Sequence, residues 1–325
     1  MSFASTKDLA DKTISFDELA PGLYGYTAEG DPNSGIVIGD DSVLVVDAQA
    51  TPAMAADVIA RIRTVTDKPI KHVVLSHYHA VRVLGASAYA GAEIIASDAT
   101  RAMIVERGQQ DMDSEIGRFP RLFRGKDSIP GLTWPTLTFH KKMTLYLGKR
   151  EVQIIHIGRS HTAGDTVVWL PKEKVIFAGD CVEFGATPYC GDAHFTDWPG
   201  TLAAIKALGP EHMVPGRGSS LIGVAKVEEG ISGTSAFTTD LFTLVKRGVA
   251  AGKTLTDIYP EVMNALRPKY GHWVIFEHCM PFNVSRAFDE AKGIDTPRIW
   301  TAERDVEMWR ALEQGSAMKS AEITR

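Results

Sequence analysis

The 325-residue sequence has few cysteines, no excess of basic residues and no long apolar run. Its three cysteines, Cys181, Cys190 and Cys279, show no CxxC spacing, so we expect free thiols in a reducing compartment rather than a disulfide framework. Lysine and arginine total 35 against 40 aspartates and glutamates, and the resulting net charge of −5 argues against nucleic acid or an anionic membrane as a partner. No segment approaches the ~18 apolar residues of a membrane span, and the N-terminal segment lacks the apolar stretch of a signal peptide. These absences predict a soluble, cytoplasmic protein.

The composition is otherwise that of an ordinary globular protein. Hydrophobic residues make up 44% and charged residues 23% of the chain, which argues against a disordered, collagen-like or coiled-coil protein. The 29 glycines require many turns and argue against an all-helical bundle. The sequence also contains ten histidines, which indicate a functional site only where several of them lie close together in the fold.

Short apolar segments alternate with amphipathic ones along the first two thirds of the chain. Residues 42–47 (SVLVVD) and 71–76 (KHVVLS) are near-continuous apolar runs, typical of strands covered on both faces, whereas residues 51–64 carry apolar side chains at helical spacing. Further strands are predicted at 22–27, 35–38, 93–96, 143–147, 152–156, 166–170 and 175–178, and further helices at 82–89, 99–108 and 198–208. This alternation predicts an α/β fold.

The later part of the chain has a different pattern. Three prolines interrupt residues 118–138, which we therefore expect to form a loop or lid. Residues 219–297 have a mainly helical pattern, apart from 268–282. We expect one domain over residues 1–222 and a mainly helical extension over 223–325 packed on that domain. Periodicity does not separate a lid from a homodimer interface as the role of this extension.

Unusual polar residues follow three of the predicted strands. His77 and His79 lie in the segment SHYH, directly after the apolar run at 73–75. His161 lies in the segment GRSHTAGD, and Asp180 is the last residue of FAGD, at the end of a predicted strand. Functional groups in layered α/β proteins lie beyond strand ends, on loops held by rigid elements. A lone histidine is more often a surface or core residue, but the joint occurrence of these segments predicts a metal site.

This ordered set resembles the metallo-β-lactamase superfamily, from Leu23 to Gly218. The segments that carry the resemblance are SVLVVD, LSHYHAVRVLGA, GRSHTAGD, FAGD and VPGRG. The resemblance implies a four-layer αββα sandwich with a metal site at one edge of the two sheets. It also implies that His77, His79 and His161 bind a first metal ion, with Asp180 adjoining or bridging.

The sequence departs from that family's pattern at three positions. Val81 stands where the motif has aspartate, Arg82 stands at the next ligand position, and Arg217 replaces the last histidine. All three belong to the ligand shell of the family's second metal. Arginine does not lose its proton and cannot coordinate a metal ion, so the sequence predicts a single metal per chain.

The two arginines allow two interpretations. Arg82 and Arg217 can take the place of the second ion and bind an anionic substrate group bidentately. Alternatively they pair with Asp47, Asp165 or Asp180 and only seal the site.

The resemblance implies hydrolysis of a small organic substrate, such as an ester, lactone or thioester. Three histidines with an open position suit zinc, which activates water near neutral pH. Asp180 would then orient that water, and Arg82 or Arg217 would stabilise developing negative charge. Because His77, His161 and Asp180 also form a two-histidine, one-carboxylate set, a mononuclear iron dioxygenase is the alternative. Lyase-like chemistry or a non-catalytic binding protein are further possibilities.

Four other residues lie near the proposed ligands in the sequence or in a similar setting. Tyr78 and His194 are candidates for contacts with substrate. Cys181 adjoins Asp180 but needs no function as a small buried residue. His278 lies in an apolar setting, where a core position is more common than a ligand role.

Overall fold

The computed structural model describes residues 10–314, whose strands form two sheets. The first sheet contains, in spatial order, β1 (Ser15–Ala20), β2 (Leu23–Thr27), β3 (Ser34–Ile38), β4 (Val43–Val46), β5 (Ile70–Val74), β6 (Glu93–Ser97) and β7 (Leu137–Phe139). The second contains β13 (Leu221–Ile222), β12 (His212–Pro215), β11 (Val175–Gly179), β10 (Thr166–Leu170), β9 (Arg150–His156) and β8 (Lys142–Leu147). Both sheets are mixed, because β4 to β7 run parallel in the first and β11 runs parallel to β12 in the second.

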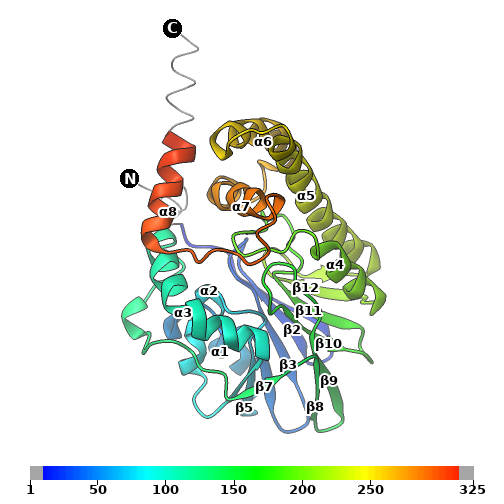
Figure 1. The fold of residues 1–325 in the computed structure, drawn as a ribbon. Coiled ribbons are helices and arrows are strands. Elements are labelled where there is room, and N and C mark those ends of the chain that lie inside the picture. Colours follow the sequence, from blue (N-terminus) through cyan, green and yellow to red (C-terminus); the bar gives the residue numbers. More distant parts are fainter. Residues whose placement is uncertain (1–9, 315–325) are drawn as a thin grey trace.

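The two sheets pack face to face through their inner apolar side chains (Figure 1). Val37 and Val74 of the first sheet share one buried cluster with Ile154 and Phe177 of the second. The sheets approach so closely at Gly35 that a Cβ there would lie 2.2 Å from the Phe177 ring. A side chain at this position would force the sheets apart, which is why the strand contains glycine.

Helices cover both outer faces of the sandwich. The first sheet is covered by α1 (Pro52–Arg63), α2 (Ala80–Val83), the short η2 (Leu84–Ala88) and α3 (Asp98–Arg118), with η3 (Lys126–Ser128) following. The second sheet is covered by α4 (Trp198–Ala207) and α5 (Val224–Ala250). The chain then forms α6 (Leu255–Tyr270), α7 (Phe276–Ala291), α8 (Ala302–Trp309) and η4 (Arg310–Gln314). The predicted four-layer architecture with a helical C-terminal region is confirmed.

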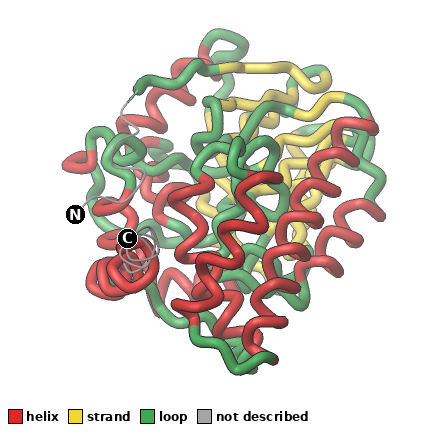
Figure 2. The backbone as a smooth tube through the Cα atoms, turned by 90° about the horizontal axis from the view of Figure 1, so that it is seen from above, coloured by secondary structure: helices red, strands yellow, loops and turns green. Residues whose placement is uncertain are grey.

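The C-terminal helices also lie across one end of the sandwich. Figure 1 shows α7 above the ends of the central strands, and in Figure 2, seen from above, helices and loops lie over the strands. Helix α8 contacts α3 of the opposite layer, so this region connects both sides of the sandwich. None of the helices within residues 10–314 is long and apolar enough to cross a membrane.

Helix α3 is longer than the sequence pattern predicts. The expected helix covers residues 99–108, whereas α3 continues to Arg118. Its second half lacks a clear apolar stripe, but Asp111 and Glu115 accept hydrogen bonds from the backbone N–H groups of Ala80 and Val81 at 2.7 and 3.0 Å. These carboxylates cap the first turn of α2, so tertiary contacts stabilise a helix that local propensity does not predict.

Candidate metal centre

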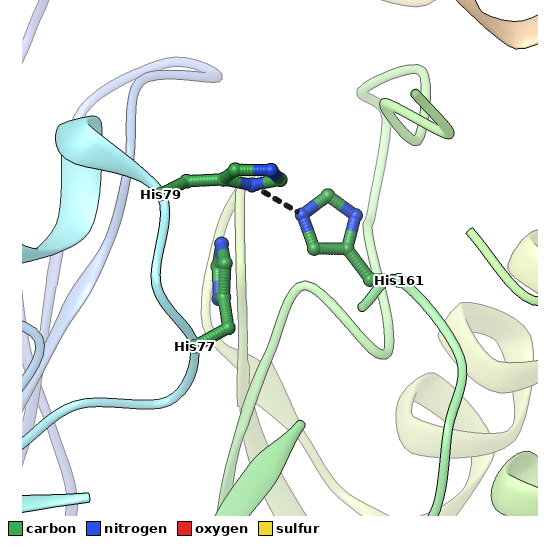
Figure 3. A group of neighbouring side chains, drawn as sticks. All are labelled: His77, His79 and His161. Atoms are coloured by element: carbon green, nitrogen blue, oxygen red, sulfur yellow. Dashed lines mark hydrogen bonds between the residues drawn. The ribbon is translucent and has the colours of Figure 1, made fainter. Parts of the chain in front are cut away.

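Three histidines converge at the edge of the sandwich, as Figure 3 shows. One ring nitrogen of each of His77, His79 and His161 lies within 4.8 Å of the others, and all three side chains are buried. His77 and His79 follow strand β5, with His79 immediately before α2, while His161 lies in the loop between β9 and β10. The two sheets therefore contribute opposite sides of one site.

The other ring nitrogen of each histidine is bound by the protein. His77 Nδ1 lies 2.9 Å from Ser76 Oγ, His79 Nε2 lies 3.1 Å from Asp192 Oδ2, and His161 Nδ1 donates to the carbonyl of Tyr189 at 2.7 Å. These contacts turn His77 Nε2, His79 Nδ1 and His161 Nε2 toward one another. A metal-binding histidine usually donates its second N–H to a carboxylate, carbonyl or similar acceptor in this way.

The donor set fits a metal ion. His77 Nε2 is buried and has no hydrogen-bond partner among residues 10–314, a state that coordination would relieve. Burial lowers the pKa of His77 well below its usual value and that of His161 to about 4, so both rings are neutral and able to coordinate. Burial opposes the charge on His79, but Asp111, Asp192 and Glu115 raise its pKa to about 9. That negative potential favours a cation at the three histidines.

Asp180 lies directly beside this set, at the end of β11. Its Oδ2 is 3.8 Å from His77 Nε2 and 3.5 Å from His161 Nε2. Burial raises the pKa of Asp180, but Arg82 and the neighbouring histidines outweigh it and hold that pKa well below its usual range. The carboxylate is therefore ionised and has one oxygen facing the histidines.

Arg82 is enclosed by the protein on several sides. Its Nη2 donates to Asp180 Oδ1 and, at 2.7 Å, to the carbonyl of Gly216, while Nη1 donates to the carbonyl of Asn33 at 2.9 Å. The same Nη1 lies 3.7 Å from Asp47 Oδ2. Both terminal nitrogens of this buried guanidinium are thus already bound by the chain.

Arg217 has far fewer contacts. Its Nη1 donates to the carbonyl of Gly30 at 3.1 Å, and its Nε lies 3.9 Å from Glu183 Oε1 without a hydrogen bond among the described residues. Glu183 is buried, and neither of its carboxylate oxygens has a side-chain hydrogen-bond partner in residues 10–314. Burial and the nearby Asp180 raise the pKa of Glu183 well above its usual value.

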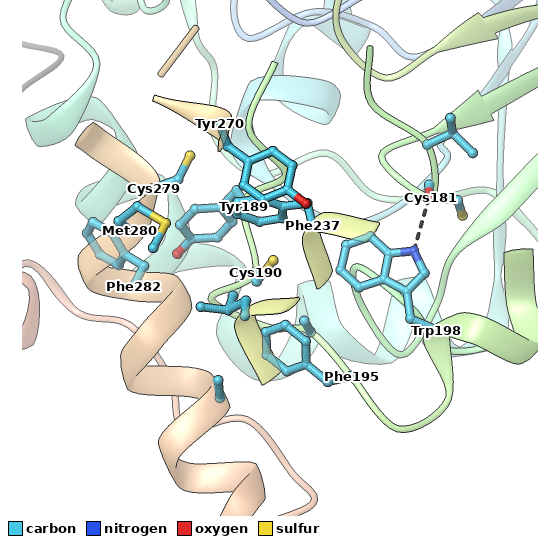
Figure 4. Packing of buried hydrophobic residues seen from close by; sticks show 14 of the residues in the cluster. Cys181, Tyr189, Cys190, Phe195, Trp198, Phe237, Tyr270, Cys279, Met280 and Phe282 are labelled. Atoms are coloured by element: carbon cyan, nitrogen blue, oxygen red, sulfur yellow. Dashed lines mark hydrogen bonds between the residues drawn. The ribbon is translucent and has the colours of Figure 1, made fainter. Parts of the chain in front are cut away.

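His79 and His161 line a small, buried cavity of about 10 Å³. A cavity of roughly this size holds at most one water molecule. Asp180 and Arg217 line the cavity together with His79, His161, Val81, Glu115, Phe119, Tyr189, Ile275 and Cys279. Figure 4 shows Cys279 and Phe282, both on α7, in the same part of the core as Tyr189.

The structure places the remaining candidates away from the cavity. Tyr78 is buried behind His79 and hydrogen-bonds Asp192. His194 faces Asp295, with Nδ1 3.8 Å from the carboxylate. The other two pack in the core: the Cys181 thiol accepts from Ser160 Oγ at 3.4 Å, and the His278 ring packs 4.0 Å from that of Phe119.

Several residues at the site carry no signal in the sequence, and Asp192 and Ile275 are two of them. Asp192 binds both His79 and, at 3.1 Å, Arg107, and despite its burial the hydrogen bond from His79 lowers its pKa to about 2. It lies in the same loop as His194, where the histidine was the more obvious candidate. Ile275 lines the cavity from a segment that has no functional motif.

Comparisons with known proteins agree with this geometry. Residues 27–217 match the family model described as "Metallo-beta-lactamase superfamily". The chain is 23% identical over 226 residues to a linear primary-alkylsulfatase from a Pseudomonas strain, covering 58% of this chain and 42% of that one. It is 34% identical over 93 residues to a type 2 metallo-beta-lactamase from Bacteroides fragilis, covering 27% of this chain and 37% of that one. It thus spans less than half the length of these curated relatives.

A solved structure extends the likeness beyond the matched region. The sec-alkylsulfatase Pisa1 from Pseudomonas sp. superposes with a TM-score of 0.68 at 17% identity, over 85% of this chain and 50% of that one. At this identity the comparison concerns the fold, and it includes part of the C-terminal helical region.

Proposed function

Because the chain belongs to the metallo-beta-lactamase superfamily, we propose that it is a hydrolase that uses one zinc ion, held by His77, His79 and His161, to cleave a small anionic organic substrate. The observation that carries the proposal is the pairing of this histidine set with an arginine that lines the same cavity. Zinc held by three histidines activates water as a nucleophile near neutral pH. The surrounding residues supply orientation and charge.

Asp180 has the position of an orienting group. Its Oδ1 is bound by Arg82, so the carboxylate is fixed in one orientation with Oδ2 toward the histidines. An oxygen held in that way accepts a hydrogen bond from the attacking water and directs it. We assign Arg82 to this fixing role rather than to substrate, because its terminal nitrogens are already bound by Asp180 and by backbone carbonyls.

Arg217 is the better candidate for substrate recognition. It lines the cavity beside Asp180 and donates one hydrogen bond to a backbone carbonyl, so most of its guanidinium donors remain for an anion. In a site closed to water, such a cation stabilises negative charge that develops on the substrate. The likeness to two alkylsulfatases supports including sulfate esters among the anions to be tested, beside carboxylic esters, lactones and thioesters.

The iron alternative uses His77, His161 and Asp180 as ligands. The position of His79 favours zinc, because its Nδ1 lies 2.9 Å from His161 Nε2 and so belongs to the donor group. Asp180 is also bound by Arg82, which reduces its availability as a ligand.

A hydrolysis screen tests the proposed function. The full chain is assayed against nitrophenyl sulfate, the neutral nitrophenyl butyrate and the anionic nitrophenyl succinate, before and after metal removal. We expect hydrolysis that disappears on chelation, returns with zinc and favours the anionic esters. Hydrolysis that persists without metal, or dioxygen consumption with an iron-loaded protein, would contradict the zinc hydrolase.

A further inference from the structure

We propose that a second pocket, next to the small, buried cavity, binds the apolar part of the substrate, and that Ile275 forms the wall that must move to connect the two. This inference rests on the proposed function, because it concerns the substrate of the same site. The pocket has a volume of about 310 Å³ and is called the outer pocket below. It is lined by Lys12, Glu29, Gly30, Asp31, Gly271, Trp273, Val274, Ile275, Phe276, Glu277 and His278.

The need for a second pocket follows from the size of the first. The cavity at the histidines holds about 10 Å³, whereas small-molecule sites span ~300–1,000 Å³. His77, His79 and His161 are each at most 2% exposed. An organic substrate therefore reaches the histidines only if part of the cavity wall moves, and the outer pocket has the volume of a binding site.

Among residues 10–314, Ile275 is the one residue common to the linings of these two spaces. Two contacts flank it across the same wall. Arg217 of the cavity donates to the carbonyl of Gly30 in the outer pocket, and Phe119 of the cavity packs on His278 of the outer pocket. Ile275 therefore belongs to the wall between the two spaces, and Arg217 reaches the outer pocket's lining through Gly30.

The backbone at Ile275 is strained. Its φ of 57° and ψ of 14° place a β-branched side chain in the left-handed region, immediately before α7. Neighbouring backbone bonds hold the segment: Val274 donates to Gly185 at 3.1 Å and accepts from Thr187 at 3.0 Å. A strained residue of this kind persists only where its surroundings hold it, and such residues are common at clamps and switches. Movement of this segment would both relieve the strain and open the cavity.

The chemistry of the outer pocket indicates what it binds. Its acidic groups are already occupied: Asp31 pairs with Arg121 at 2.6 Å, and Glu277 pairs with Arg267 at 2.9 Å. Glu29 likewise accepts from the backbone of Thr13.

The rest of the lining consists of Lys12, whose charge acts on Glu29, of Gly30, Gly271 and His278, and of an apolar part formed by Trp273, Val274, Ile275 and Phe276. An uncharged, apolar group fits this lining, while Arg217 behind the wall attracts an anion. The geometry therefore favours a substrate with an apolar body and an anionic group at one end.

The rate of metal release tests whether Ile275 controls access to the histidines, and it needs no assay of catalysis. Zinc-loaded full-length protein is mixed with an excess of a chromogenic chelator, and the rate of metal transfer is followed. We expect Ile275→Gly, which removes the side chain and the strain, to accelerate transfer at least tenfold. Ile275→Val, which keeps the β-branched wall, should stay within about twofold of the wild type. Equal rates in all three proteins would show that Ile275 does not control access.

Ligand binding tests the outer pocket even in a chain that carries no metal. The probe is octane-1-sulfonate, an apolar chain with a stable anionic end, measured by calorimetry with octan-1-ol as the neutral probe. We expect Val274→Asp, a change at a 40% exposed side chain, to weaken both probes at least fivefold, while Ile222→Asp, at a 54% exposed side chain of β13, leaves both unchanged. Ile275→Gly should strengthen sulfonate binding more than alcohol binding, because it exposes Arg217.

The two results separate the pocket from the reaction. Binding that follows this pattern without zinc-dependent hydrolysis would contradict the proposed function and leave the outer pocket in place. If Val274→Asp changes neither affinity, the outer pocket is not the binding site, whatever the protein hydrolyses.

Discussion

Arg82 and Arg217 lie at the same edge of the two sheets, but their contacts with the rest of the protein are very different. Arg82 is held by two carboxylates and two backbone carbonyls. Arg217 has one backbone acceptor and a distant carboxylate, and it lines the cavity. Residue type alone would give both arginines one role. Their different partners support the proposal that Arg82 has a structural role and that Arg217 contacts the substrate.

Among the predicted changes, removal of Arg82 should have the largest effect, and the property affected should be the stability of the fold. Arg82→Ala would leave Asp180 and Asp47 buried without their cation, and breaking such a pair costs about 3–5 kcal/mol. We expect a large loss of folding free energy, measured by chemical denaturation. The Arg217→Ala variant is the matched control and should lose ~1 kcal/mol or less, because its ion pair is long. Similar losses for both variants would contradict the distinction.

Removal of Arg217 should act on substrate recognition instead. Arg217→Met keeps an unbranched side chain that fills the space of the arginine stem and removes the charged guanidinium, so we expect kcat/KM for an anionic ester to fall about 10- to 100-fold. A neutral ester of the same leaving group should lose only a few fold. Paired kinetics on these two esters provide the measurement, with thermal melting as the control for folding. An equal loss on both esters would mean that Arg217 does not recognise charge.

Substitution of Glu183 should have the smallest effect on stability, and this effect should depend on pH. This buried carboxyl faces Asp180, Arg217 and Arg82, and its hydrogen-bond neighbour on α5 is Thr234, which binds the Glu183 backbone. Its pKa is raised in the folded state, so its contribution to stability is full below the unfolded pKa and is lost as pH rises toward the folded pKa.

Glu183→Gln removes this titration. The stability of the variant relative to wild type should therefore increase from pH 5 to pH 8, as measured by denaturation at both values. An equal relative stability at pH 5 and pH 8 would mean that Glu183 is already ionised in the folded protein at pH 5, which would contradict its raised pKa.

Much of the fold follows directly from local sequence. The apolar runs at 42–47 and 175–178 contain β4 and most of β11, because a strand buried on both faces needs apolar residues at nearly every position. The helix predicted at 99–108 ends ten residues early, because the rest of α3 depends on contacts with α2 that sequence spacing does not encode. Helix α6 likewise continues past Pro268 in its last turn.

The candidate site also contains some residues that the sequence predicts and others that it does not. His77, His161 and Asp180 each lie in the loop that follows a strand, so their convergence could be expected from the order of the strands. Asp192 comes from the long connection between β11 and α4, and Ile275 from the short connection between α6 and α7, and packing of the C-terminal helices sets the paths of both. The difference between Arg82 and Arg217 depends on the carbonyls of Asn33, Gly216 and Gly30, and a backbone acceptor leaves no mark in the sequence.

The metal content of the protein tests the central claim most directly. The full chain is equilibrated with excess zinc, freed of loosely bound metal by gel filtration and analysed for zinc per chain. The three-histidine site with Arg82 on Asp180 predicts one zinc, which His161→Ala abolishes and which mutation of the exposed His140 leaves unchanged. Two zinc ions per chain, or one that survives His161→Ala, would contradict the account.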